Sequence, residues 1–85
     1  MKHVKLFYLK NCPYCKRALE CIDDIKRRCP ELRSVDIEAV EENEHADIAE
    51  QYDYHYVPAF YVDERKVHEG AATDEQVERV LRAAL

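Results

Sequence analysis

The chain has 85 residues and a formal net charge of −5, and a chain this short forms one small domain, residues 1–85, without room for a separate cofactor-binding half. An acidic chain without interleaved basic and aromatic residues gives no reason to expect a nucleic-acid partner. No stretch approaches the roughly 20 apolar residues of a membrane span, so we expect a soluble, cytoplasmic protein that does not act at membranes.

The first half of the chain predicts a strand, a helix and a second strand. Residues 4–9 are apolar at nearly every position, which is typical of a strand covered on both faces of its sheet. Residues 13–28 have helical spacing, and Pro30 ends this helix. Over residues 34–39 polar and apolar side chains alternate, as in a half-buried strand. The inward residues of that strand are expected to be Val35, Ile37 and Ala39.

The second half predicts a helix and a strand hairpin. Asn43 can cap the helix. The expected inner face of that helix is Ala46, Ala49 and Tyr52. Residues 57–62 are expected to form a strand with Pro58 at its entrance, followed by a polar turn over 63–66 and a short returning strand over 67–69.

The end of the chain predicts a last helix. Gly70 ends the predicted strand over residues 67–69. Thr73 and Gln76 have the spacing of a capping box. The apolar face of this helix consists of Val77, Val80, Leu81 and Ala84. The element order β-α-β-α-β-β-α predicts an α/β fold with a four-stranded mixed sheet and three helices, because a βαβ unit gives a parallel pair and a hairpin gives an antiparallel one.

Cys12 and Cys15 stand between the first strand and the first helix, separated by Pro13 and Tyr14. Two cysteines at this spacing can close a small disulfide ring. At a helix start, free backbone N–H groups and the helix dipole stabilise a thiolate. Pro13 suits the first turn, where a missing N–H costs nothing. Cys12 is therefore a candidate nucleophile, with Cys15 as its resolving partner.

The other two cysteines, Cys21 and Cys29, are interpreted as small apolar residues beside the core. Regular apolar periodicity and a single glycine argue against a secreted fold stapled by disulfides. A zinc site would need a second CxxC pair or a spaced pair of histidines, and the sequence has neither. We therefore expect no bound metal.

Charge is distributed unevenly along the chain. Residues 1–33 hold nine Lys or Arg and four Asp or Glu, whereas residues 34–64 hold ten Asp or Glu and no Lys or Arg. The acidic stretch is interpreted as solvated surface. Near the paired cysteines stand Lys10, Lys16 and Arg17, which can stabilise a thiolate or attract an anionic thiol.

Two motifs together give the chain a family resemblance. The stretch from Cys12 to Ala18 resembles the active site of glutaredoxins, and residues 48–52 with Val57-Pro58-Ala59 resemble the thioredoxin pattern. Over its whole length the chain thus resembles the thioredoxin superfamily, and most closely the small glutaredoxins and glutaredoxin-like thioredoxins.

The resemblance implies roles for several residues. Cys12 would be the nucleophile that forms a mixed disulfide with the substrate, and Cys15 the thiol that resolves it. Pro58 would be cis and lie against the active-site disulfide, and the backbone of Val57 would pair with a bound peptide or glutathione. The other candidate substrate-binding residues are Lys10, Tyr14, Lys16, Gly70 and Asp74.

Two departures from the glutaredoxin pattern concern glutathione. Glutaredoxins usually carry a Gly-Gly pair followed by an acidic residue, whereas here Gly70 precedes Ala71, with Asp74 in register with the acidic residue. Lys10 lies closer to Cys12 than the glutathione-binding lysine of that family usually does. Glutathione is thus a candidate co-substrate, and no tightly bound cofactor is expected.

The sequence predicts a monomeric thiol–disulfide oxidoreductase that reduces protein disulfides or glutathione mixed disulfides. Its expected partners are disulfide-containing proteins and a reductant, which is either glutathione or an enzyme of the thioredoxin-reductase type. The alternative prediction is an iron–sulfur or metal-binding module in which Cys12 works together with a partner chain in a dimer.

Overall fold

The computed structural model describes residues 1–85. Its four strands form one mixed sheet in the order β2-β1-β3-β4. β1 (Val4–Tyr8) pairs parallel with β2 (Ile37–Glu41) and antiparallel with β3 (Ala59–Val62), which in turn pairs antiparallel with β4 (Arg65–Glu69). The predicted four-stranded mixed sheet is confirmed.

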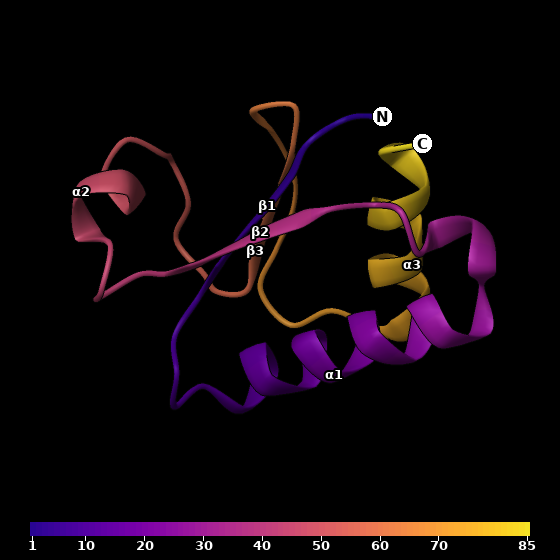
Figure 1. The fold of residues 1–85 in the computed structure, drawn as a ribbon. Coiled ribbons are helices and arrows are strands. Elements are labelled where there is room, and N and C mark those ends of the chain that lie inside the picture. The colour runs from indigo at the N-terminus through magenta and orange to yellow at the C-terminus, as the bar shows by residue number, and fades with distance from the viewer.

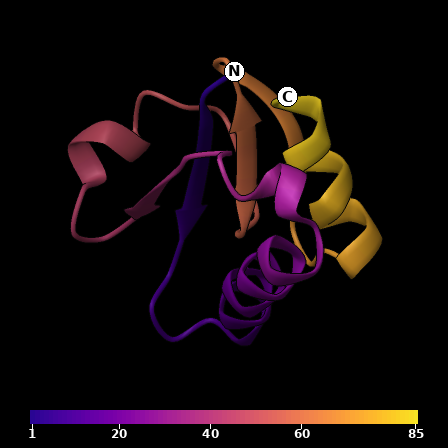
Figure 2. The same ribbon diagram turned by 45° about the vertical axis from the view of Figure 1, so that its right-hand side comes forward.

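Helices lie on both faces of this sheet. α1 (Pro13–Arg28) and α3 (Asp74–Ala83) lie together on one face, and α2 (Ala46–Ala49) lies on the other (Figure 1 and, from a second side, Figure 2). A short 3-10 helix, η1 (Pro30–Leu32), follows α1. The predicted element order and the bounds of α1 are confirmed. None of the helices has the length and hydrophobicity needed to span a lipid bilayer.

The main apolar core fills the space between the sheet and the pair α1 and α3. It contains 14 buried residues, among them Ile25, Phe60 and Leu81, which expose none of their surface. Burying one side chain of this size contributes about 1.5–3 kcal/mol. The predicted apolar face of α3 is confirmed, because its four residues are all buried: Val77, Val80, Leu81 and Ala84.

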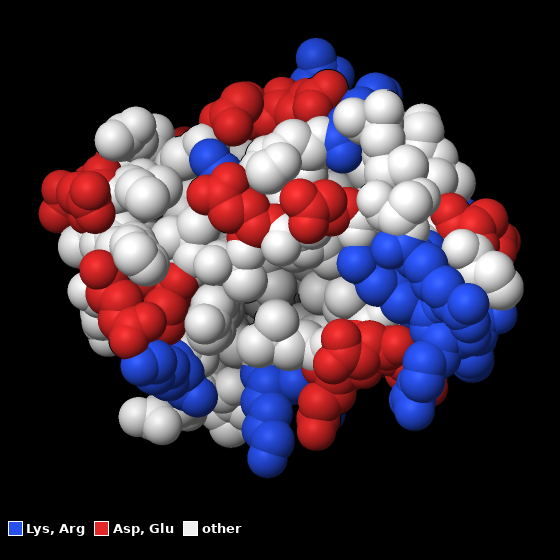
Figure 3. Space-filling model, viewed as in Figure 1, with Lys and Arg blue, Asp and Glu red and all other residues white.

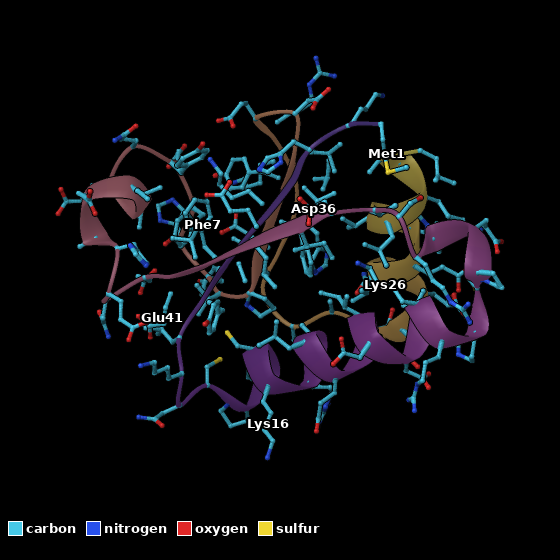
Figure 4. All side chains as sticks on the ribbon, in the orientation of Figure 1. Met1, Phe7, Lys16, Lys26, Asp36 and Glu41 are labelled. Atoms are coloured by element: carbon cyan, nitrogen blue, oxygen red, sulfur yellow. The ribbon has the colours of Figure 1, made fainter.

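A smaller aromatic cluster covers the other face of the sheet. Phe7 of β1 lies at its centre, between the sheet and α2 (Figure 4). The ring centroid of Phe7 is 4.8 Å from that of Tyr52 and 5.0 Å from that of Tyr54. The tyrosines that follow α2, and not the face of a long helix, therefore bury this side of the sheet.

The start of α2 differs from the prediction. His45 is its N-cap residue, and no side chain caps the helix. Asn43 lies in the preceding turn, where its backbone N–H donates to the carboxylate of Glu41. Ala46 is exposed, because a helix of only four residues turns little more than Ala49 toward the sheet.

The strands also differ from the prediction in their bounds and in the residues that they bury. β2 is Ile37–Glu41 and not residues 34–39, and β3 begins at Ala59 and not at residue 57. Ala39 is exposed and Val40 is buried, because β2 is an edge strand whose Val40 faces the aromatic cluster while Ala39 is left uncovered. The hairpin turn is only Asp63 and Glu64, both at positive φ (48° and 68°), as a two-residue turn of type I′ requires. β4 consequently begins earlier than expected, at Arg65.

Candidate active site

The paired cysteines lie at the start of α1. Cys12 is the N-cap residue, and the backbone N–H of Cys15 donates to its Sγ at 3.4 Å. Cys12 is half-buried, whereas Cys15 in the first turn exposes only 1% of its surface. Both thiols are free in this structure. The accessible sulfur of the pair is therefore that of Cys12.

The two thiols differ in acidity. Partial burial opposes the thiolate of Cys12, but hydrogen bonds from the Cys15 thiol and from the backbone N–H groups of Cys15 and Tyr14 outweigh it and lower the pKa of Cys12. Burial raises the pKa of Cys15 to about 12. A thiol of lowered pKa that solvent can reach is the more reactive of two. The arrangement thus pairs a more reactive thiol, that of Cys12, with a less reactive one, that of Cys15.

Site residues from all four strands meet at one edge of the sheet. In the register of the strands, Tyr8 lies opposite Glu41, Phe7 opposite Ala59, and Ala59 opposite Glu69. The loop that leads to Cys12, the turn after β2, the segment before β3 and the end of β4 therefore share this edge (Figure 1). Pairing between distant segments, and not sequence proximity, assembles the site.

The peptide bond between Val57 and Pro58 is cis, as the family resemblance implies. Pro58 is buried, and its carbonyl accepts the N–H of Gly70 at 2.8 Å. No hydrogen bond within the chain uses the backbone N–H or C=O of Val57. Because Val57 is half-buried and its N–H and C=O have no partners within the chain, both groups suit pairing with an extended peptide.

An open hollow of about 440 Å³ lies beside Cys12, between the loop before α1 and the turn after β2. Its lining residues are Leu9, Lys10, Asn11, Cys12, Glu41, Asn43 and Glu44. The Lys10 ammonium, a predicted substrate-binding group, pairs with the carboxylate of Glu44 at 2.5 Å. With two carboxylates and one ammonium, the hollow carries a net negative charge.

Two aromatic side chains stand exposed around the site. Tyr14 exposes 54% of its surface and Tyr56 exposes 69%. Lys16 points from the first part of α1 into solvent (Figure 4).

Gly70 has a φ of 88°, and a Cβ added there would lie 3.7 Å from the Cβ of Tyr56. The left-handed conformation, more than the available space, explains the glycine.

Asp74 has a partner inside the fold. Its Oδ1 accepts a hydrogen bond from the Cys21 thiol at 3.1 Å, which joins α1 to the start of α3. Burial, followed by this bond to Asp74, raises the pKa of Cys21 to about 12. Cys21 is buried, and Cys29 is half-buried and packed against the main core. Asp74 thus has a structural contact that its sequence position did not reveal.

Two carboxylates at the site edge were missed by sequence reasoning. Glu69 accepts the backbone N–H groups of His55 at 2.7 Å and Tyr56 at 3.0 Å. Its hydrogen bond with Lys66, together with these two, lowers the pKa of Glu69 to about 2. Glu41, only 4% exposed, binds two loops in the same way. Glu41 is the last residue of β2, and Glu69 is the last residue of β4. Both therefore lie at the edge of the sheet where the parallel strands β1 and β2 end, and this position is the signal that could have identified them.

No three His, Cys, Asp or Glu side chains of this chain gather closely enough to hold a metal ion. An iron–sulfur cluster on Cys12 would therefore need ligands from elsewhere, such as a partner chain.

Comparison with known proteins agrees with this geometry. A family model described as thioredoxin domain matches residues 2–82. The chain belongs to the thioredoxin domain family. No curated protein matches it. Membership in this family suggests thiol–disulfide exchange, for which the adjacent Cys12 and Cys15 are suited; the glutaredoxin-like subtype stays a prediction.

Solved thioredoxins have the same fold. The oxidised thioredoxin from Plasmodium falciparum is 16% identical with a TM-score of 0.72, over 96% of this chain and 79% of that one. Fasciola hepatica thioredoxin is 17% identical with a TM-score of 0.72, over 99% of this chain and 81% of that one. At such identities the likeness establishes the fold alone.

Proposed function

We propose that this thioredoxin-domain protein reduces disulfides of other proteins through Cys12 and Cys15, and that glutathione mixed disulfides are its poorer substrates. The observation that carries the proposal is the placement of two thiols at one helix start. Cys12 is the half-buried N-cap residue, and its Sγ accepts the N–H of Cys15 at 3.4 Å, whereas Cys15 exposes only 1% of its surface. In keeping with this placement, the pKa of Cys12 is lowered and that of Cys15 is raised to about 12.

The exchange has two steps. The Cys12 thiolate attacks one sulfur of the substrate disulfide, so a bond forms between Cys12 and that sulfur while the substrate bond breaks and the freed thiolate takes a proton from solvent. Cys15 then loses its proton and attacks the Sγ of Cys12, which breaks the mixed disulfide and releases the second substrate thiolate. Two electrons pass to the substrate, and glutathione or a thioredoxin-reductase-type enzyme reduces the new disulfide.

The surroundings of Cys12 support a protein substrate. The unpaired backbone groups of Val57 suit an extended peptide, which would add its own backbone hydrogen bonds there. Tyr14 and Tyr56 offer exposed aromatic surface to apolar side chains of such a peptide. Two groups expected to bind glutathione are engaged within the chain, Lys10 by Glu44 and Asp74 by Cys21.

A trapping experiment tests the proposal. Cys15→Ser removes only the resolving thiol, so substrates should remain attached to Cys12 and appear as mixed-disulfide bands on non-reducing gels. Cys12→Ser should trap none. The matched control is Cys29→Ser, which should behave as the parent because this thiol lies away from the start of α1. Equal trapping by Cys12→Ser and Cys15→Ser would show that the assigned roles are wrong.

A further inference from the structure

Glu41 is the buried charged side chain of this protein, with 4% of its surface exposed. A buried carboxylate is costly unless hydrogen bonds replace its water. One oxygen accepts the backbone N–H groups of Asn43 at 2.6 Å and Glu44 at 2.9 Å, and the other accepts that of Lys10 at 3.0 Å. These bonds, led by that from Glu44, hold the pKa of Glu41 below its usual value although burial opposes them.

The three donors belong to two separate segments. Lys10 lies in the loop between β1 and α1, two residues before Cys12, whereas Asn43 and Glu44 lie in the turn after β2. Glu41 therefore links the two segments that border the hollow beside Cys12. Figure 4 shows Glu41 next to the loop that leads into α1.

The position of this loop determines the position of the reactive sulfur. The N–H of Cys12 donates to the carbonyl of Leu9 at 3.3 Å, which closes a turn around Lys10. The Sγ of Cys12 in turn accepts the N–H of Cys15 at 3.4 Å. A shift of this loop would change the distance between the Cys12 Sγ and the N–H groups of the helix start, and at a longer distance these groups stabilise the thiolate less.

We propose that Glu41 is a positioning residue, whose carboxylate holds the loop before α1 where the Cys12 sulfur meets the N-terminal N–H groups of the helix. The inference rests on the proposed exchange function and names a further residue of that same site. The titratable groups around the Cys12 thiol are Cys15 from α1 and, in the hollow, Lys10, Glu41 and Glu44.

The variant Glu41→Gln tests this role. Glutamine keeps the size of the side chain, but its amide nitrogen is a donor and cannot accept the N–H that one carboxylate oxygen now binds. The matched control is Glu38→Gln, which makes the same charge change on an exposed side chain of β2 that contacts His3. The readout is the rate of iodoacetamide modification of Cys12 against pH, followed by mass spectrometry.

We expect the pKa of Cys12 in Glu41→Gln to rise by about one unit. Modification at pH 6 would then be about tenfold slower, and the rates would converge at a pH above both pKa values. Glu38→Gln should keep the profile of the parent. A Glu41→Gln protein with lower stability but an unchanged Cys12 profile would overturn the proposal, because a merely structural residue behaves in that way.

A second pair of variants tests the same role without substitution of Glu41, in case the Glu41→Gln protein does not fold. Lys10→Pro deletes the backbone N–H that Glu41 accepts, whereas Lys10→Gln keeps this N–H and removes only the charge. We expect the pKa of Cys12 to be higher in Lys10→Pro than in Lys10→Gln, and equal values would also overturn the proposal. If the pKa shifts as expected but Cys15→Ser traps no substrate, the positioning role stands and the proposed function fails.

Discussion

Two thiols three positions apart differ in acidity and exposure because one helix start gives them different surroundings. Cys12 stands before the first turn and meets N–H groups, whereas Cys15 faces the interior. The sequence could predict this difference, since the place of each cysteine relative to the helix start follows from the motif. The partners of Lys10 and Asp74 could not be predicted, because Glu44 and Cys21 lie far from them in the sequence.

The difference in acidity predicts selective alkylation. At neutral pH, iodoacetamide should modify Cys12 well before Cys15, because the pKa of Cys12 is lowered and that of Cys15 is raised to about 12. Cys21, whose pKa is also about 12 and which is buried, should resist as Cys15 does. Mass spectrometry of the reduced protein after brief labelling measures this order, and faster modification of Cys15 would contradict it.

The residue after Gly70 should limit the use of glutathione. In the glutaredoxin pattern a second glycine lets the backbone approach glutathione closely, and Ala71 adds a methyl group there. Such a misfit commonly costs ~1–3 kcal/mol, against ~0.2–1 kcal/mol from an exposed ion pair. Ala71→Gly should therefore speed reduction of a small glutathione mixed disulfide about fivefold or more, since ~1.4 kcal/mol corresponds to tenfold.

The same preparation supplies the control for this prediction. Reduction of insulin by dithiothreitol should proceed equally with the parent and with Ala71→Gly, because a peptide that pairs with Val57 does not need the second glycine. If the parent already matches an ordinary glutaredoxin and Ala71→Gly changes nothing, the steric argument is wrong.

The helices show which features of an element a sequence can reveal. The capping box at the start of α3 was predictable, because both of its hydrogen bonds are local: Thr73 Oγ1 accepts from the N–H of Gln76 at 3.2 Å, and the Gln76 side chain accepts from the N–H of Thr73 at 2.9 Å. The shortness of α2 could not be predicted. The tyrosines beyond α2 pack on the Phe7 ring of the sheet, and these contacts join residues that are distant in sequence. The local spacing of apolar residues therefore predicted a helix that was too long.

Loss of the capping box should destabilise the protein measurably. Thr73→Ala removes the acceptor for the N–H of Gln76 at the start of α3, and such a change typically costs about 1 kcal/mol in the free energy of unfolding. Ser34→Ala, a hydroxyl deletion at an exposed turn, should change it by less than about 0.5 kcal/mol. Urea denaturation measures both, and equal effects would show that the capping box contributes nothing specific.

At the scale of the whole molecule, most Asp and Glu residues of the acidic stretch are exposed, as expected of solvated surface, whereas Glu41 is buried. Lys and Arg gather around the C-terminal end of α1, whereas acidic side chains are spread over the same face of the molecule (Figure 3). Within the acidic set, Glu41 and Glu69 accept backbone N–H groups from loops that border the active site. These ionised carboxylates thus supply hydrogen bonds to backbone N–H groups of the loops around the site.

This use of carboxylates predicts how stability depends on pH. The pKa of Glu69 is lowered to about 2 in the folded protein from an ordinary value near 4.5, so its stabilising contribution is fully present above the ordinary value and is lost as the pH falls toward 2. The pKa values of Glu41 and Asp24 are lowered too. The urea midpoint should therefore fall steadily between about pH 5 and pH 2.

Substitution of Glu69 identifies its share of this decline. Glu69→Gln should lower the urea midpoint at pH 7, where the parent carboxylate is ionised and paired with Lys66. It should lower the midpoint much less at pH 2, where the parent carboxylate is about half protonated in the folded protein and most of its charge-dependent stabilisation is lost. The matched control is Glu50→Gln, an exposed carboxylate at the end of α2, which should shift neither midpoint. A parent and a Glu69→Gln variant whose midpoints run parallel from pH 7 to pH 2 would show that Glu69 does not stabilise the fold through its charge.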